Sequence, residues 1–322
     1  MEDNCTCRNN NILVSVVCNA YNHEKYIRSA LEGFVMQKTT FPFEVLIHDD
    51  ASTDRTAEII REYEIKYPEI IKPIYSKENQ YSKRDGSLIR IQYGRVQGKY
   101  IAICEGDDYW TDPLKLQKQY DLLESYPEID ICATAAKTEF NGGINGQIAP
   151  AVKDCIFPTE DVILGDGGFV ATASLMYRTN IRKNPLPFFN VLSLDYTIQI
   201  AGSIRGGMLF LADYTCVYRM FTEGSWTSRV AHNPERSIAN RKQIKNMLLQ
   251  LDLDTSGKYH DVIMKKTKMY QFTINYLEHN YKEICAKENK EFFMELPIYK
   301  RLVMKLGTVL PQIADLIWKV VR

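Results

Sequence analysis

Short apolar runs alternate with segments of helical periodicity through the first third of the chain. The apolar runs have the length of buried strands, and they span residues 12–18, 43–48, 70–75 and 100–104. In residues 24–37 and 56–66 the apolar side chains instead recur every three or four positions, as on one face of a helix. Strand, helix, strand, helix, strand is the order of a parallel α/β sheet. We therefore expect an α/β fold whose central strand is residues 100–104.

The alternation continues beyond this strand and then stops. We expect helices at 113–125 and 195–203, a loop or hairpin at 141–155, and strands at 129–135, 169–177 and 208–221. From residue 233 to residue 288 the pattern is helical, with few Gly or Pro residues. The change predicts a boundary near residue 230, between an α/β domain over 1–230 and a helical region over 231–322.

The last segment, residues 297–322, is both basic and apolar. Five Lys or Arg residues face a single acid, Asp315, and Pro311 should divide the segment into two helices. A basic amphipathic segment of this kind can lie in a membrane interface. The alternative is that these helices pack on the α/β domain or on another subunit of a homo-oligomer.

Composition narrows the class of protein. The 322 residues are 45% hydrophobic, and 40 basic residues balance 40 acidic ones, so no overall field favours nucleic acid as a partner. Eight cysteines are scattered without a Cys-x-x-Cys pair, which fits a reducing cytosol. The first eight residues are polar, and no apolar run reaches transmembrane length. We expect a cytoplasmic protein, soluble or held at the inner face of the membrane.

Acidic side chains follow two of the predicted strands. Asp49 and Asp50 end the strand at 43–48, and Glu105, Asp107 and Asp108 follow the strand at 100–104. Carboxyl ends of parallel strands meet at one edge of a sheet, so both clusters should face one crevice. Crowded carboxylates repel one another, and a Mg²⁺ or Mn²⁺ ion would relieve that repulsion. A solvated acidic turn explains either cluster alone, but two on one edge favour a site.

Three segments together resemble the family 2 glycosyltransferases of GT-A fold. They are residues 14–22, 49–54 and 105–110, and the similarity in order, spacing and position at strand ends extends over residues 12–228. The resemblance implies a GT-A type, Rossmann-like and mostly parallel sheet flanked by helices. It also implies a nucleotide-sugar donor and a divalent metal, Mn²⁺ or Mg²⁺.

The resemblance assigns roles to the residues after the first two strands. Ala20 and Tyr21 match positions that line the nucleoside pocket in the family. Asp49 or Asp50 would accept a hydrogen bond from a ring N–H of uracil or thymine. The alternative for this second motif is helix capping, which explains Ser52 and Asp54 but neither of the two leading acids.

The resemblance implies that the acidic motif after the central strand contacts the phosphates and the sugar of the donor. Glu105 stands where the family usually has Asp, and would contact ribose or a metal-bound water. Asp107 matches the metal ligand, which is bridged through the ion to the diphosphate. Asp108 matches the position that holds donor hydroxyls.

Two further positions complete the expected site. Asp195 opens a predicted helix and matches the family's catalytic base, although an acid there also suits the helix dipole. Arg219 lies in a segment, residues 218–228, where the family has Tyr-Arg-x-His, and would contact the diphosphate or form a structural salt bridge. Phe221 replaces the histidine, which removes one potential metal ligand. Trp226 would stack on a sugar or pack internally.

The resemblance predicts an inverting transferase that moves a sugar from a UDP- or dTDP-linked donor to a hydroxyl group. The acceptor would be a glycan or lipid-linked glycan in cell-surface polysaccharide synthesis. The alternative is a catalytically silent nucleotide-sugar-binding or interaction module of the same fold. Retention of Asp107 and Asp195 favours the enzyme.

Overall fold

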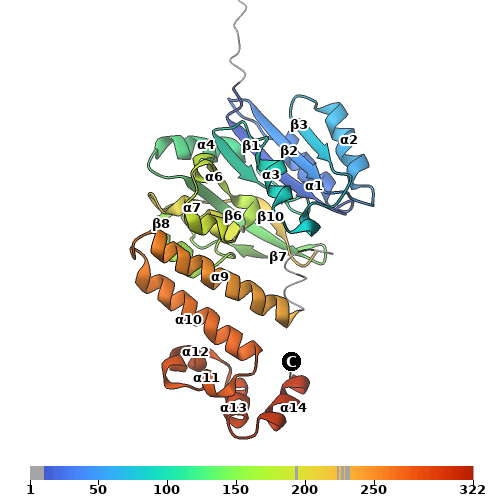
Figure 1. Ribbon diagram of the computed structural model, residues 1–322. Helices are drawn as coiled ribbons and strands as arrows, with labels where there is room; N and C mark the ends of the chain where they lie inside the picture. The colour runs from blue at the N-terminus through green and yellow to red at the C-terminus, as the bar shows by residue number, and fades with distance from the viewer. Residues whose placement is uncertain (1–10, 193–194, 223–224, 226–227, 229–232, 322) are drawn as a thin grey trace, which may run out of the picture. The chain divides into compact units, whose positions relative to one another are not determined.

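The computed structural model describes residues 11–192, 195–222, 225, 228 and 233–321 (Figure 1). The chain divides into two compact units. The first comprises Met1–Pro185 and Ser193–Glu223, and the second comprises Leu186–Leu192 and Gly224–Arg322. A short segment from within the predicted α/β domain therefore belongs to the helical unit, because Pro187–Asn190 forms a 3-10 turn that contacts helix α9 (Pro234–Asp254).

The first unit is built on one mixed sheet. Its strands lie in the order β3-β2-β1-β4-β9-β6-β10-β5, with β7 paired to β6 and β8 paired to β10 (Figure 1). The strands are β1 Val14–Ala20, β2 Phe43–Asp49, β3 Ile71–Tyr75, β4 Tyr100–Ile103, β5 Tyr109–Trp110, β6 Ile131–Phe140, β7 Gly143–Ile148, β8 Cys155–Phe157, β9 Met176–Arg178 and β10 Met208–Arg219. Strands β3, β2, β1 and β4 are mutually parallel, and so are β6 and β10.

Helices of both units follow the predicted pattern with a few differences. In the first unit they are α1 Ile27–Val35, α2 Thr56–Lys66, α3 Ser87–Tyr93, α4 Lys115–Ser125, α5 Thr159–Gly165, α6 Asn180–Lys183 and α7 Asp195–Ser203. In the second unit they are α9 Pro234–Asp254, α10 His260–Leu277, α11 Tyr281–Ile284, α12 Lys290–Glu295, α13 Ile298–Gly307 and α14 Pro311–Val321. An α/β sheet with a helical C-terminal region is thus confirmed, and Pro311 begins a new helix as predicted.

The strand predicted at residues 169–177 is mostly absent, and a 3-10 turn takes its place. Residues 169–177 were expected to be extended, but Thr172–Ser174 is a 3-10 turn and only Met176–Arg178 pairs, antiparallel to β4 and β6. The turn is held in place because the indole of Trp110 donates to the carbonyl of Ala173 at 2.9 Å. This interruption brings residue 172 to the site described below.

Close packing between α1 and β5 fixes the acidic turn that lies between β4 and β5. Phe34 and Trp110 meet edge to face, with ring centroids 5.0 Å apart. A Cβ atom at Gly33 would lie 2.9 Å from the backbone nitrogen and oxygen of Trp110, so only glycine permits this approach. The turn at 105–108 is therefore anchored by a buried aromatic contact directly behind it.

The second unit has a small apolar core of its own. Buried side chains of α10, α11, α12, α13 and α14 meet in it, and they include Phe272, Tyr281, Ile284, Phe292, Phe293 and Met304. Helices α9 and α10 pack on each other. Within residues 11–192, 195–222 and 233–321, no helix combines the length and apolar character needed to cross a membrane.

Candidate active site

The carboxyl ends of three parallel strands meet at one edge of the sheet. Ala20 at the end of β1 lies opposite Asp49 at the end of β2. The N–H of Asp50 donates to the carbonyl of Ala20 at 2.9 Å, and the N–H of Gly106 donates to that of Asn19 at 2.9 Å. Both acidic clusters therefore lie on the same edge, as the sequence predicts.

Hydrogen bonds join the loop after β1 to the loop after β2. The side-chain oxygen of Asn22 accepts from the backbone N–H of Thr53 at 2.8 Å, and the backbone N–H of Asn22 donates to Ser52 Oγ at 3.0 Å. The N–H of His23 donates to Thr56 Oγ1 at 2.7 Å. Asn22 and Ala51 both have positive φ, 56° and 63°, which is unfavourable for alanine. Strain of this kind persists where the surrounding structure enforces it, often at functional sites.

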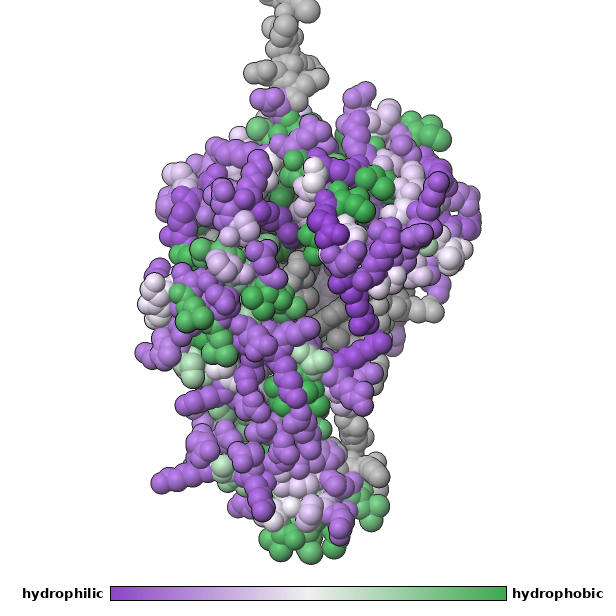
Figure 2. All heavy atoms as spheres, in the orientation of Figure 1, coloured by the Kyte–Doolittle hydropathy of each residue, from purple (hydrophilic) through white to green (hydrophobic). Residues whose placement is uncertain are grey.

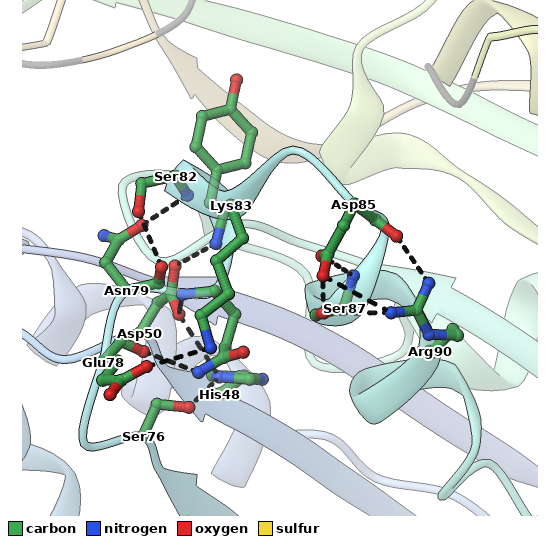
Figure 3. Close-up of polar contacts among 12 residues, drawn as sticks. His48, Asp50, Ser76, Glu78, Asn79, Ser82, Lys83, Asp85, Ser87 and Arg90 are labelled. Atoms are coloured by element: carbon green, nitrogen blue, oxygen red, sulfur yellow. Dashed lines mark hydrogen bonds and ion pairs between the residues drawn. The ribbon is translucent and has the colours of Figure 1, made fainter.

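Asp50 is committed to a structural role. Its two carboxylate oxygens accept the backbone N–H groups of Gln80 and Tyr81, at 2.6 and 3.0 Å (Figure 3). His48 lies beside it, with Nε2 2.8 Å from Ser76 Oγ and 3.6 Å from Asp50 Oδ1. These contacts fix the path of the chain after β3.

Asp49 is buried but has an unsatisfied acceptor. The residue is 3% exposed, and its Oδ1 atom has no hydrogen-bond partner. Burial raises the pKa of this carboxyl, while hydrogen bonds from Ser52 act in the opposite direction. A buried acceptor without a partner is rare in folded proteins, and a ligand donor would satisfy it.

Two basic residues of the segment after β3 already have acidic partners. Lys83 pairs with Glu78 at 3.0 Å, and the guanidinium of Arg90 lies 3.8 Å from the carboxylate of Asp85 (Figure 3). Their charges are therefore balanced locally.

Glu105 lies under the influence of several carboxylates. Its oxygens accept the backbone and side-chain N–H groups of Asn19 at 3.3 and 3.4 Å. Burial and then the charge of Asp107 raise the pKa of Glu105 to about 7, and the charge of Asp195 adds to the shift. The charge of Asp195 therefore influences Glu105, although Asp195 lies 90 residues further along the chain.

Asp107 and Asp108 differ in exposure and partners. Asp107 is half-buried, and its Oδ2 accepts from the hydroxyl of Thr222 at 2.8 Å. Asp108 is 3% exposed, and its Oδ1 accepts the N–H of Arg219 at 2.8 Å. Burial, and then the charge of Asp107, raises the pKa of Asp108 well above its usual range. Such a set of carboxylates favours the arrival of a cation.

Arg219 links the acidic turn at 105–108 to Glu139 of β6. Its Nε lies 3.3 Å from Glu139, one NH group donates to the carbonyl of Asp107 at 2.9 Å, and the guanidinium lies 4.3 Å from the centre of the Tyr109 ring. The structural salt bridge considered for this residue is present. A contact between Arg219 and a diphosphate stays a prediction.

His23 is a site residue that the sequence reasoning passed over. A Cβ atom at Gly106 would lie 2.8 Å from His23 Nδ1, and that nitrogen is buried without a hydrogen-bond partner. Burial lowers the pKa of His23, while the charges of Asp107, Asp54 and Asp49 oppose that shift. No spacing between histidines in the sequence indicates that His23 lies at the site. Its place two residues after Tyr21, in a loop at the predicted crevice, was the available signal.

Asp195 begins α7, as predicted, and is held by two hydrogen bonds. Its Oδ2 accepts from the hydroxyl of Thr172 at 2.5 Å, and its Oδ1 accepts the N–H of Tyr196 at 2.7 Å. Burial raises the pKa of this carboxyl. A Cβ atom at Gly167 would lie 3.6 Å from Asp195 Oδ1, so the neighbouring loop passes close to the carboxylate. A fixed carboxylate with a raised pKa suits proton abstraction.

The donor set fits a divalent ion shared with a ligand. Across the described parts of the chain, no three His, Cys, Asp or Glu side chains are grouped so as to hold a metal by themselves. One or two carboxylates plus ligand phosphates are, however, the usual protein-bound environment of Mg²⁺. Asp107 offers such a carboxylate at a half-buried position. The residues present therefore fit an ion that arrives with a diphosphate.

Phe221, which stands at the position of the family's histidine, presents an aromatic ring in place of a potential metal ligand. It is 39% exposed, has a φ of 58°, and meets Phe140 edge to face at 5.9 Å between ring centroids. Tyr21, on the wall formed after β1, is 45% exposed, whereas Ala20 is buried. Trp226 lies outside the described residues.

Comparison with known proteins identifies the family. Residues 15–181 match the model described as "Glycosyl transferase family 2". An uncharacterised protein of Mycobacterium tuberculosis is 36% identical over 215 residues, which are 67% of this chain and 61% of that relative. An Escherichia coli protein described as UDP-Glc:α-D-GlcNAc-diphosphoundecaprenol β-1,3-glucosyltransferase is 34% identical over 113 residues, 35% of this chain and 42% of that one.

Solved structures agree with the family match at the level of fold. The TarS protein of Staphylococcus aureus with UDP-GlcNAc superposes with a TM-score of 0.58 and 17% identity, over 92% of this chain and 80% of that one. The predicted GT-A fold is confirmed. With its motif residues on one sheet edge and its family model matched over half its length, this chain belongs to glycosyl transferase family 2.

Proposed function

We propose that this protein transfers a sugar, with inversion, from a UDP- or dTDP-linked donor to a hydroxyl group of a glycan or lipid-linked glycan. The observation that carries the proposal is the position of Asp49 and the Glu105–Asp108 turn on one sheet edge. The charge of Asp195, which adds to the raised pKa of Glu105, supports including that residue in the site. The bound UDP-GlcNAc of TarS supports a uridine donor, and the E. coli relative's name supports a lipid-linked acceptor.

In this proposal the donor lies across the ends of β1, β2 and β4. The unsatisfied Oδ1 of Asp49 accepts the ring N–H of the base, and Ala20 and Tyr21 line the nucleoside. Asp107 would hold a Mg²⁺ or Mn²⁺ ion, whose charge would stabilise the departing diphosphate. Glu105 faces the ribose or a metal-bound water, and Asp108 holds donor hydroxyls. Asp50 acts as a support, because both of its carboxylate oxygens are already engaged. Arg219, which supports the acidic turn, would also contact the diphosphate.

Asp195 is the base of the proposed reaction. Its carboxylate takes the proton of the acceptor hydroxyl while that oxygen forms a bond to the anomeric carbon. The bond from the anomeric carbon to the diphosphate oxygen breaks on the opposite face, and the nucleoside diphosphate leaves with the electron pair. The hydrogen bonds from Thr172 and Tyr196 hold the carboxylate in one orientation. A pKa raised by burial makes the carboxylate a stronger base than an exposed one.

Replacing Asp195 by Asn tests this role. The amide keeps the size of the side chain but cannot take the proton, so we expect transfer to fall by about 10²- to 10⁴-fold. Donor affinity should change by less than about threefold, because Asp195 belongs to the acceptor side in the proposal. The measurements are nucleotide release with a panel of UDP- and dTDP-sugars and, separately, calorimetric titration with UDP and Mn²⁺.

The same experiment separates the enzyme from a silent binding module. A module would bind the nucleotide but release none from any donor, whether or not Asp195 is present. Turnover retained by Asp195→Asn would remove Asp195 from its role as base while leaving transferase activity intact. Thr172→Val, which removes only the hydroxyl that orients Asp195, should lower turnover less than Asp195→Asn and leave UDP binding unchanged.

A further inference from the structure

Helices α13 and α14 present an apolar surface that the core of their own unit does not use. On and just after α13 the side chains of Ile298, Leu302 and Val309 are 68%, 63% and 76% exposed. On and just before α14, Leu310, Ile313 and Leu316 are 47%, 47% and 65% exposed. Figure 2 shows hydrophobic residues gathered where α13 leads into α14. We call these six side chains the aliphatic face.

The opposite side of both helices is already packed. Val303 and Met304 are buried in the core of the second unit, and so is Ala314 of α14. A Cβ atom at Gly307 would come within 2.3 Å of the Tyr281 ring, so α13 lies directly against that side chain. This tight contact fixes the rotation of α13 and turns Ile298 and Leu302 outward. The aliphatic face is thus held outward by the fold of its own unit.

The surroundings of the aliphatic face are basic. Residues 297–322 contain five Lys or Arg residues and one acid, which gives a net charge of +4. Lys305 is exposed on the same side of α13 as Leu302 and Val309. The single acid, Asp315, is engaged by His279 at 2.7 Å and by the hydroxyl of Tyr281. Positive charge next to exposed aliphatic side chains is the pattern of a helix that lies in a membrane interface.

We propose that the aliphatic face binds the surface of a bilayer that contains acidic lipids. Ile, Leu and Val side chains would enter the acyl boundary, while Arg301 and Lys305 contact acidic headgroups. With 10 and 11 residues, α13 and α14 are too short to span a bilayer, which needs about 20. They would therefore lie in its plane.

A second copy of the chain is the main alternative occupant, and the charge distribution disfavours it. A two-fold interface places the same patch of each copy against itself. Here that would bring two sets of basic residues together, and like charges across an interface are unfavourable. An acidic lipid surface instead complements them.

Flotation of the full-length protein with lipid vesicles tests the proposal. One vesicle type contains phosphatidylglycerol and phosphatidylethanolamine, and the other contains only phosphatidylcholine. We expect at least about tenfold stronger binding to the acidic vesicles. The double variant Leu302→Glu/Ile313→Glu should lose binding to both types. Arg301→Gln/Lys305→Gln should weaken the preference for acidic lipid and leave binding to the phosphatidylcholine vesicles unchanged.

The controls use equally exposed apolar residues elsewhere. Ile65 and Val152, in the first unit, are 81% and 92% exposed, and Ile65→Glu/Val152→Glu should bind vesicles like the wild type. Every variant should keep the wild-type melting temperature and UDP affinity, which separates this test from that of the proposed function. Absence of flotation, or flotation unchanged in Leu302→Glu/Ile313→Glu, would overturn the proposal. The proposal would also be overturned if the wild-type protein formed a concentration-dependent dimer and Leu302→Glu/Ile313→Glu were monomeric.

Discussion

Asp49 and Asp50 are adjacent in the sequence, yet their carboxylates have different partners. Asp50 accepts two backbone N–H groups from Gln80 and Tyr81, whereas one oxygen of Asp49 accepts none. At the end of a strand, successive side chains point in opposite directions, so the Asp49 carboxylate points away from the loop that Asp50 holds. Asp50 therefore supports the fold, whereas Asp49 keeps a buried acceptor without a partner.

This difference predicts opposite phenotypes for two matched substitutions. Asp50→Ala should lower the free energy of unfolding by about 2–4 kcal/mol, because two buried N–H groups lose a charged acceptor. Asp49→Ala should change stability by less than about 1 kcal/mol, because burial opposes ionisation of that carboxylate, and should weaken UDP binding by at least about tenfold. Chemical denaturation and calorimetry measure the two effects. Equal loss of stability in both variants would contradict the assignment.

The site residues could be listed from the sequence, but several of their contacts could not. Acidic residues after strands 43–48 and 100–104 predicted the edge of the sheet correctly. The choice between Asp49 and Asp50 depends on where residues 80 and 81 return, 30 residues later in the chain. His23 was missed because its significance lies in contact with Gly106, which no spacing within the sequence indicates.

At the scale of elements, the acidic turn is packed against the end of β1 and the start of α1. A Cβ atom at Gly106 would lie 2.8 Å from His23 Nδ1, 3.0 Å from Ile27 Cδ1 and 3.1 Å from Ala20 Cβ. The absence of a side chain at this position lets the turn approach both elements. Its backbone conformation lies outside the left-handed region, so steric contact alone should decide the effect of a substitution.

Gly106→Ala should lower the free energy of unfolding by about 1–3 kcal/mol and weaken UDP binding, because the new methyl group overpacks this junction. Gly106→Ala should cost less stability in a His23→Ala background than in the wild-type protein, because the imidazole no longer meets the new methyl group. Thermal denaturation of the four proteins in this cycle measures the coupling. Gly143→Ala is the control, since a Cβ atom there has only an ordinary contact, at 3.9 Å. Strictly additive effects would show that His23 does not restrict the turn.

Elements were predicted best where their periodicity was local. Thr56–Lys66 and Asp195–Ser203 are helices within the predicted bounds. The apolar run at 169–177 was expected to be one strand. Instead it contains a turn, which is supported by a hydrogen bond from the Trp110 indole to the carbonyl of Ala173. Apolar composition alone does not distinguish an extended strand from a buried turn that is fixed by a distant side chain.

At the scale of the whole molecule, the chain consists of two units, and the catalytic proposal rests on the first. The family match over residues 15–181 lies within this unit and includes its sheet edge. The change to a helical pattern predicted a second unit. It could not predict that Leu186–Leu192 joins that unit, since this depends on packing between residues distant in the sequence.

The most direct test of the central claim is a crystal structure with UDP and Mn²⁺, in which anomalous scattering locates the metal. We predict one Mn²⁺ ion within about 2.5 Å of an Asp107 carboxylate oxygen and of the diphosphate. The uracil N–H should lie within hydrogen-bond distance of Asp49 Oδ1. An ion that has no contact with Asp107, or a uridine bound away from the ends of β1, β2 and β4, would contradict the claim.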